Sequence, residues 1–131
     1  MITFKWNDFD FTLIQLDKGI FKNDMAGHSH AKNSYELHYI IDGEGTLNTD
    51  SKVYALSKGD FFVTGPNIYH QQSTNPQNPL TEIFIYLQAS EKKTNDAPNV
   101  VIINMMEKPI IVVQPIPRIC VRLLPAHCEI C

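Results

Sequence analysis

Two stretches that each begin with a glycine, residues 27–45 and 59–70, constrain the fold of this chain more than any other feature. The first reads Gly27-His28-Ser29-His30 and, after a short polar spacer, Tyr35-Glu36-Leu37-His38-Tyr39-Ile40-Ile41-Asp42-Gly43-Glu44-Gly45. In an extended segment residues two apart share a face, so His28 and His30 are expected to point the same way. Glu36, His38 and Ile40 share a face for the same reason. Imidazoles and a carboxylate aimed at one space favour a divalent metal or a small polar ligand.

The second stretch is a short apolar strand followed by a Gly-Pro turn that ends in a histidine. It reads Gly59-Asp60-Phe61-Phe62-Val63-Thr64-Gly65-Pro66-Asn67-Ile68-Tyr69-His70. Asp60 is expected to brace the turn after Gly59. Gln72, in register with His70, is either a solvent-facing strand residue, which is the simpler interpretation, or a donor and acceptor in a pocket. His38 is either a polar plug hydrogen-bonded to a neighbouring carboxylate or a group that contacts a ligand.

Turn signals recur about every eight to twelve residues, a spacing typical of an all-β sandwich or barrel. Two short strands are expected between Ile2 and Leu16, followed by a turn at Asp17-Lys18-Gly19. The segment Thr81–Leu87 is apolar on both faces and belongs in the middle of a sheet, and a polar loop is expected from Ala89 to Pro98. Residues 35–42 are also apolar or aromatic on both faces, which favours a homodimer that covers one of them.

Together the two stretches resemble the paired motifs of the cupin superfamily. That pattern is a His-x-His, a Glu a few residues on, a Gly seven residues after the Glu, and later a Gly-Asp, a Pro-containing turn and a His. The interval from Glu36 to Gly43 fits it, and so does Gly59-Asp60 through Pro66 to His70. The variety it is most similar to is the sensor domain of AraC-type transcriptional regulators, where Tyr-Glu-Leu-x-Tyr leads into Gly-x-Gly and Pro-x-x-x-His closes the second motif. The resemblance covers about residues 25–88 and implies a double-stranded β-helix, the jelly-roll barrel of cupins.

The resemblance also implies a set of metal ligands, His28, His30, Glu36 and His70, which would suit Zn, Fe, Mn or Ni. Five residues separate His30 from Glu36, whereas cupins that bind metal well usually have three or four, so the three histidines are the stronger ligand candidates. AraC-type sensor domains often keep the pocket without a metal. In that case a small polar molecule, such as a sugar or an organic acid, is expected to contact Glu36, His38, Ile40, His70 and Gln72.

Two classes of function follow. The first is a cytoplasmic sensor module that closes its barrel over a small molecule, as the similarity to AraC-type regulators implies. The second is a metal-dependent cupin enzyme, an isomerase or a dioxygenase, in which the ion polarises substrate or O₂. No nucleophile with a paired base and no phosphate-cradling loop is apparent, so no catalytic residue is predicted apart from the metal ligands.

Length and charge limit the partners. The 131 residues are expected to form one domain, with a barrel core at residues 1–98 and a C-terminal extension at 99–131 that adds edge strands and no second domain. The formal net charge is −3 and no basic run exceeds Lys92-Lys93, so direct binding of nucleic acid by this chain is not expected. No signal peptide is evident and no apolar run approaches the ~20 residues of a membrane span.

The cysteines lie near the end of the sequence. All three fall within the last twelve residues, where Cys120 precedes His127-Cys128-Glu129-Ile130-Cys131. This odd number does not make a disulfide framework, and a reducing cytosol is the simplest compartment. A second zinc site is an alternative to reduced thiols here, although the pattern lacks a second Cys-x-x-Cys.

Overall fold

A computed structural model of the chain describes residues 1–6, 9–91 and 114–115. These residues form ten strands, and within them there is no helix, so no helix of the described part could span a membrane. The strands are β1 (Ile2–Trp6), β2 (Phe9–Ile20), β3 (Met25–His28), β4 (Ser34–Asp42), β5 (Glu44–Thr49), β6 (Val53–Ser57), β7 (Asp60–Thr64), β8 (His70–Thr74), β9 (Thr81–Glu91) and β10 (Gln114–Pro115).

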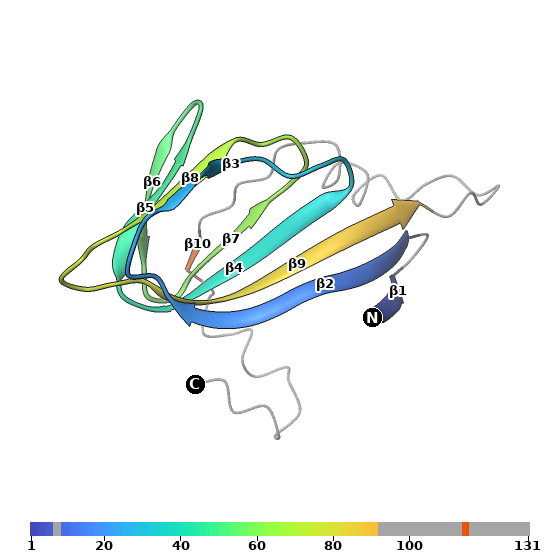
Figure 1. Ribbon diagram of the computed structural model, residues 1–131, viewed down its shortest axis with the longest axis horizontal. Coiled ribbons are helices and arrows are strands. Elements are labelled where there is room, and N and C mark those ends of the chain that lie inside the picture. The colour runs from blue at the N-terminus through green and yellow to red at the C-terminus, as the bar shows by residue number, and fades with distance from the viewer. Residues whose placement is uncertain (7–8, 92–113, 116–131) are drawn as a thin grey trace, which may run out of the picture.

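The strands form two antiparallel sheets that face each other as a jelly-roll sandwich. One sheet has the order β1-β2-β9-β4-β7-β10 and the other β3-β8-β5-β6. Figure 1 shows the long strands β2, β9 and β4 side by side, with the four-stranded sheet on one face of them. The all-β class and jelly-roll architecture predicted from the turn spacing and the paired motifs are therefore confirmed.

Strand β9 occupies the middle of the larger sheet, as its two apolar faces predict. It pairs with β2 on one side and with β4 on the other. In the register with β4, Phe84 lies opposite His38 and Tyr86 opposite Glu36. Paired residues present their side chains on the same face of a sheet. The inner face of β9 therefore lies beside the candidate site.

The predicted strand ends need two corrections, and β9 explains both. Asp17-Lys18-Gly19 is not a turn, because β2 continues through it, with Asp17 opposite Phe84 and Gly19 opposite Glu82. Residues 89–91 are not the start of a loop, since they extend β9 along the first residues of β2. In both places a long partner strand satisfies the backbone hydrogen bonds, and this outweighs the local preference for a turn.

The apolar core lies between the sheets, beyond the polar part of β4. Its members come from both sheets and from the residue before β9, and all are almost fully buried: Ile40, Leu47, Leu56, Phe62 and Leu80. Along the inner face of β4 the side chains thus change from Glu36 and His38 to Ile40. One half of this strand serves the site and the other half the core.

The outer face of the larger sheet retains exposed apolar side chains. Leu16 and Ile20 of β2 are 60% and 59% exposed, and Ile14, next to the irregularity between Leu13 and Gln15, is 47% exposed. The expected homodimer stays a prediction.

The C-terminal expectations fall almost wholly outside the described residues. These include the apolar runs at 100–103 and 110–113, the cysteine cluster from Cys120 to Cys131, and the boundary between residues 98 and 99. Of this region the structure describes Gln114 and Pro115, which pair with Phe61 and Asp60 at the edge of β7. The division into core and extension stays a prediction.

Two turns show why glycine is required where it is. Gly43, between β4 and β5, has a φ of 89°, and a Cβ there would collide with the backbone of Pro79 and Leu80. Gly59, before β7, has a similar φ of 92°, but a Cβ there would have no neighbour within 4 Å. At the Gly59 turn Asp60 accepts hydrogen bonds from the backbone N–H and the hydroxyl of Ser57 at 2.7 and 3.2 Å, so the predicted bracing role is confirmed.

These glycines form a matched pair for mutation. Gly59→Ala should lower the free energy of unfolding by about 1–2 kcal/mol, the cost of a Cβ in left-handed backbone. Gly43→Ala should cost about 1–3 kcal/mol more, because its Cβ also displaces packed backbone. Urea denaturation of both variants measures the difference. Equal losses would contradict the close packing of the β4–β5 turn against the segment before β9.

A buried phenol adds a pH test of the same strand. Tyr35 at the start of β4 is 8% exposed, and burial raises the pKa of its hydroxyl to about 12. A raised pKa means that this group's contribution to stability is complete below pH ~10 and is lost as the pH rises towards 12. Wild type should therefore lose more stability than Tyr35→Phe as the pH rises from 10 to 12. The free energies of unfolding are measured by urea denaturation at each pH. If they change in parallel for wild type and Tyr35→Phe, the phenol is not buried.

Candidate metal centre

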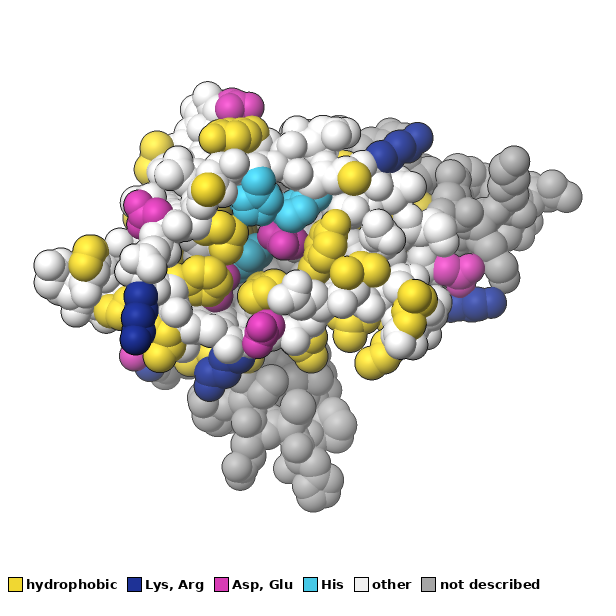
Figure 2. Space-filling model, viewed as in Figure 1, with side chains coloured by type: hydrophobic (Ala, Val, Ile, Leu, Met, Phe, Trp, Pro, Cys, Tyr) yellow, Lys and Arg dark blue, Asp and Glu magenta, His cyan; other side chains and the backbone are white. Residues whose placement is uncertain are grey.

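Four side chains far apart in the sequence meet between the sheets. His28, His30, Glu36 and His70 each place one ligand atom so that these atoms lie within 4.8 Å of one another. The ring centroids of His28 and His70 are 4.4 Å apart, and that of His30 is 5.0 Å from His28 and 5.2 Å from His70. Figure 2 shows histidine and acidic side chains gathered in a hollow of this face, with hydrophobic side chains around them. The predicted convergence of these four residues is thus observed.

Backbone pairing positions the three histidines, as it positions Glu36 opposite Tyr86. His28 at the end of β3 is the register partner of His70 at the start of β8, so their side chains share a face. His30 lies beyond β3 and is held by a bridge to Pro66, where the N–H of Asn67 donates to the carbonyl of His30 at 2.9 Å. Asn67 has a φ of 59°, a left-handed conformation that Asn tolerates. The Gly-Pro turn of the second motif therefore holds a histidine of the first.

Hydrogen bonds to the backbone fix which nitrogen of two imidazoles faces the centre. Nδ1 of His28 donates to the carbonyl of Ala26 at 2.9 Å, and Nδ1 of His70 donates to that of Ile68 at 3.0 Å. Because a carbonyl oxygen can only accept, Nδ1 carries a proton in both rings, and in the neutral form of each ring the lone pair is on Nε2. Metal-bound histidines are oriented in this way in proteins.

Two of the ligand atoms are buried without a hydrogen-bond partner among the described residues. They are Nε2 of His70 and Nε2 of His30. Nε2 of His30 does approach Oε2 of Glu36 to 2.9 Å, but without the alignment that a hydrogen bond needs, and Nε2 of His70 lies 3.8 Å from the same oxygen. A buried nitrogen without a hydrogen-bond partner lowers the stability of the fold unless a ligand or a metal ion binds it. Three imidazoles and a carboxylate in this arrangement fit a divalent transition metal.

The charges in the site also suit a bound divalent metal. Burial alone would raise the pKa of Glu36, but the surrounding imidazoles of His30, His38 and His70 outweigh it and hold that pKa well below its usual range. Burial would lower the pKa of His38, but hydrogen bonds and charge attraction from Glu36 and Glu82 raise it. Glu36 is therefore a carboxylate at neutral pH, as a metal ligand must be.

A second layer of polar residues lies behind Glu36. Nδ1 of His38 donates to Oε1 of Glu82 at 3.0 Å, and Nε2 of His38 lies 3.3 Å from Oε2 of Glu36. The amide of Gln72 donates to Oε2 of Glu82 at 2.6 Å. His38 thus does bond to neighbouring carboxylates. Ile40, also expected at the ligand, lies in the apolar core.

Two residues in this layer revise the sequence interpretation. Gln72 is 3% exposed, so the simpler expectation of a solvent-facing side chain is wrong: β8 packs its inner face against the larger sheet, and Gln72 shares that face with His70. Glu82, 0% exposed, was not predicted at all. The sequence does contain one sign of it. Glu82 shares a face of β9 with Phe84 and Tyr86, so a charged residue interrupts an otherwise apolar face.

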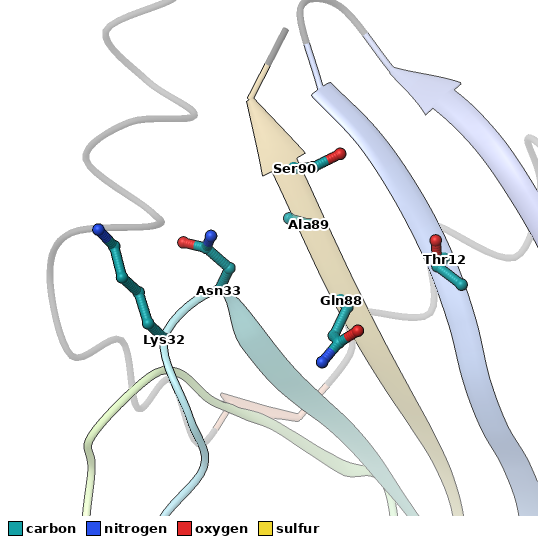
Figure 3. Close-up of a pocket in the computed structure, with 6 residues that line it drawn as sticks. All are labelled: Thr12, Lys32, Asn33, Gln88, Ala89 and Ser90. Carbon is teal, nitrogen blue, oxygen red and sulfur yellow. The ribbon is translucent and has the colours of Figure 1, made fainter.

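A separate hollow of about 260 Å³ lies near the end of β9. Figure 3 shows its residues: Lys32 and Asn33 before β4, Gln88, Ala89 and Ser90 on β9, and Thr12 on β2. None of them belongs to the group of four ligands. Among the described residues the hollow has no acidic, histidine or cysteine side chain in its lining.

Comparison with known proteins agrees with this geometry. Residues 22–86 match the family model described as Cupin domain. Over 64 residues the chain is 38% identical to acireductone dioxygenase from Tuber melanosporum, an alignment that covers 45% of this chain and 37% of that protein. The crystal structure of YhaK from Escherichia coli is similar in fold, with a TM-score of 0.52 and 20% identity over 66% of this chain and 40% of YhaK. The chain thus spans less than half the length of either protein.

Proposed function

We propose that this chain, which carries a cupin domain at residues 22–86, is a metal-dependent cupin enzyme of the dioxygenase type. The observation that carries the proposal is the meeting of His28, His30, Glu36 and His70, with buried imidazole nitrogens that have no hydrogen-bond partner among the described residues. The similarity to a protein named acireductone dioxygenase over the same part of the chain supports the choice of reaction. An isomerase with the same ligand set is the alternative within this class.

The four residues would hold Fe, Ni, Mn or Zn, all of which accept imidazole and carboxylate. When bound, such an ion supplies a Lewis acid that polarises substrate or O₂. Glu36 contributes the single negative charge of the set, and the backbone carbonyls of Ala26 and Ile68 keep two of the imidazoles in the ligating tautomer. The Tyr86 ring, centred 5.2 Å from that of His30, provides an aromatic wall beside the ligands.

The sensor function implied by AraC-type proteins is the second candidate. Its support is the motif from Tyr35 to Gly45 and from Pro66 to His70. It requires His38 and Gln72 to present donors and acceptors to a small polar molecule, but both are engaged with Glu82. For this reason the enzyme is preferred. We place either one in the cytoplasm, as a homodimer.

Removal of single histidines tests the ligand set. His30→Ala and His70→Ala should each abolish the metal that the purified, untagged protein retains, because each removes one of only four ligands. Ser29→Ala, between His28 and His30 and exposed, is the control and should retain the full amount. Metal content is measured by mass spectrometry of the intact preparation. Unchanged metal in both histidine variants would refute the ligand set.

Oxygen uptake tests the reaction. Protein loaded with Fe²⁺ should consume O₂ when an acireductone is added, and Glu36→Gln should lower kcat by about 100-fold or more, because it removes the single negative charge of the ligand set. An oxygen electrode gives the rate. Turnover without O₂ uptake would favour the isomerase. Saturable binding of a sugar or organic acid without turnover would favour the sensor.

A further inference from the structure

We propose that Glu82 is a positioning residue of the metal centre, which acts through His38 to orient the carboxylate of Glu36. The inference rests on the proposed function, because it assigns a role towards the bound ion to a residue that does not touch it. Glu82 lies on β9, outside both motifs of the sequence, and is not one of the four ligands.

Both carboxylate oxygens of Glu82 are engaged from different directions. Oε1 accepts from His38 on the neighbouring strand β4, and Oε2 accepts from Gln72 on β8 of the facing sheet. With a 0% exposed side chain, Glu82 has no access to water. Two hydrogen bonds at 3.0 and 2.6 Å therefore fix its position within the sandwich.

The link from Glu82 to the ligands is the ring of His38. Each of its two nitrogens faces a carboxylate oxygen, at 3.0 Å from Glu82 and 3.3 Å from Glu36. The ring stacks on Phe62, with centroids 4.3 Å apart and an interplanar angle of 6°, and on Phe84 at 6.1 Å. A ring held on its faces and at both nitrogens resists rotation, so it links the position of Glu82 to that of the Oε2 oxygen of Glu36.

The same network connects the two sheets that supply the ligands. Gln72 lies two residues after His70 on β8, whereas Glu36 lies on β4. Burial of a carboxylate between the sheets costs stability relative to a well-packed apolar side chain. A role in holding the facing ligands in register accounts for a charged residue at this position.

Cobalt binding provides a test that does not depend on activity. Glu82→Gln keeps the shape of the side chain but removes its charge, and it should weaken Co²⁺ binding by about 10–100-fold, as changes behind metal ligands do. The visible absorption of bound Co²⁺ should also change, because the geometry of the Glu36 ligand changes. Asp60→Asn is the matched control: it also neutralises a buried acid, but one that holds the β6–β7 turn. It should leave the Kd for Co²⁺ within about twofold, since neutralising an acid remote from the ligands leaves their outer layer intact.

A double-mutant cycle separates positioning from general destabilisation. If Glu82 acts through His38, then Glu82→Gln should weaken Co²⁺ binding no further in a His38→Leu background, in which the link to Glu36 is gone and all four ligands remain. Additive losses would overturn the proposal, and so would a wild-type Kd for Glu82→Gln. If Glu82→Gln does not fold, Gln72→Leu frees one oxygen of Glu82 and should weaken binding by about 3–10-fold, and an unchanged Kd there would overturn it as well. Wild-type protein that binds no Co²⁺ or other divalent metal would overturn the proposed function together with this inference.

Discussion

The pairing of β3 with β8, which sets His28 opposite His70, is the constraint on which the site depends. It places two imidazoles from separate parts of the chain on one inner face, with ring centroids 4.4 Å apart. A shift of one residue would turn His70 towards solvent, since side chains alternate along a strand. The turn that ends at His70 also carries Pro66, whose bridge holds His30. Backbone pairing, and not the histidines themselves, therefore brings the ligands together.

A polar interior of this kind needs a source of stability elsewhere in the fold. Along the inner face of β4, Glu36 and His38 are followed by Ile40, which packs in the apolar core with Phe62 and Leu80. Each fully buried side chain of that core contributes about 1.5–3 kcal/mol. Each unpartnered buried nitrogen costs about 1–3 kcal/mol. The sandwich can carry an unsatisfied site along one half of β4 because the other half packs in the apolar core.

The sequence predicts this arrangement best where the signal is local. The recurring turns predict an all-β fold, and the cupin resemblance of the motifs that hold the histidines, Glu36 and the glycine turns implies the jelly roll and the group of four that the structure brings together. The ends of the strands were predicted less well, because the extension of β2 through Asp17 to Gly19 depends on its pairing with β9, about sixty-five residues later in the chain. Local preference for a turn cannot reveal a partner so distant.

Glu82 shows the limit of sequence reasoning most clearly. Alternation along β9 places it with Phe84 and Tyr86, and a carboxylate on such a face is itself a sign of a buried polar partner. Which partner it has cannot be read from β9, because Gln72 comes from the opposite sheet and His38 from the next strand. Only the folded structure shows that the hydrogen-bonded chain from Gln72 through Glu82 and His38 reaches the ligand Glu36. An acidic residue within an apolar strand can thus mark the outer layer of a metal centre, while its connection to the ligands is a property of the tertiary structure alone.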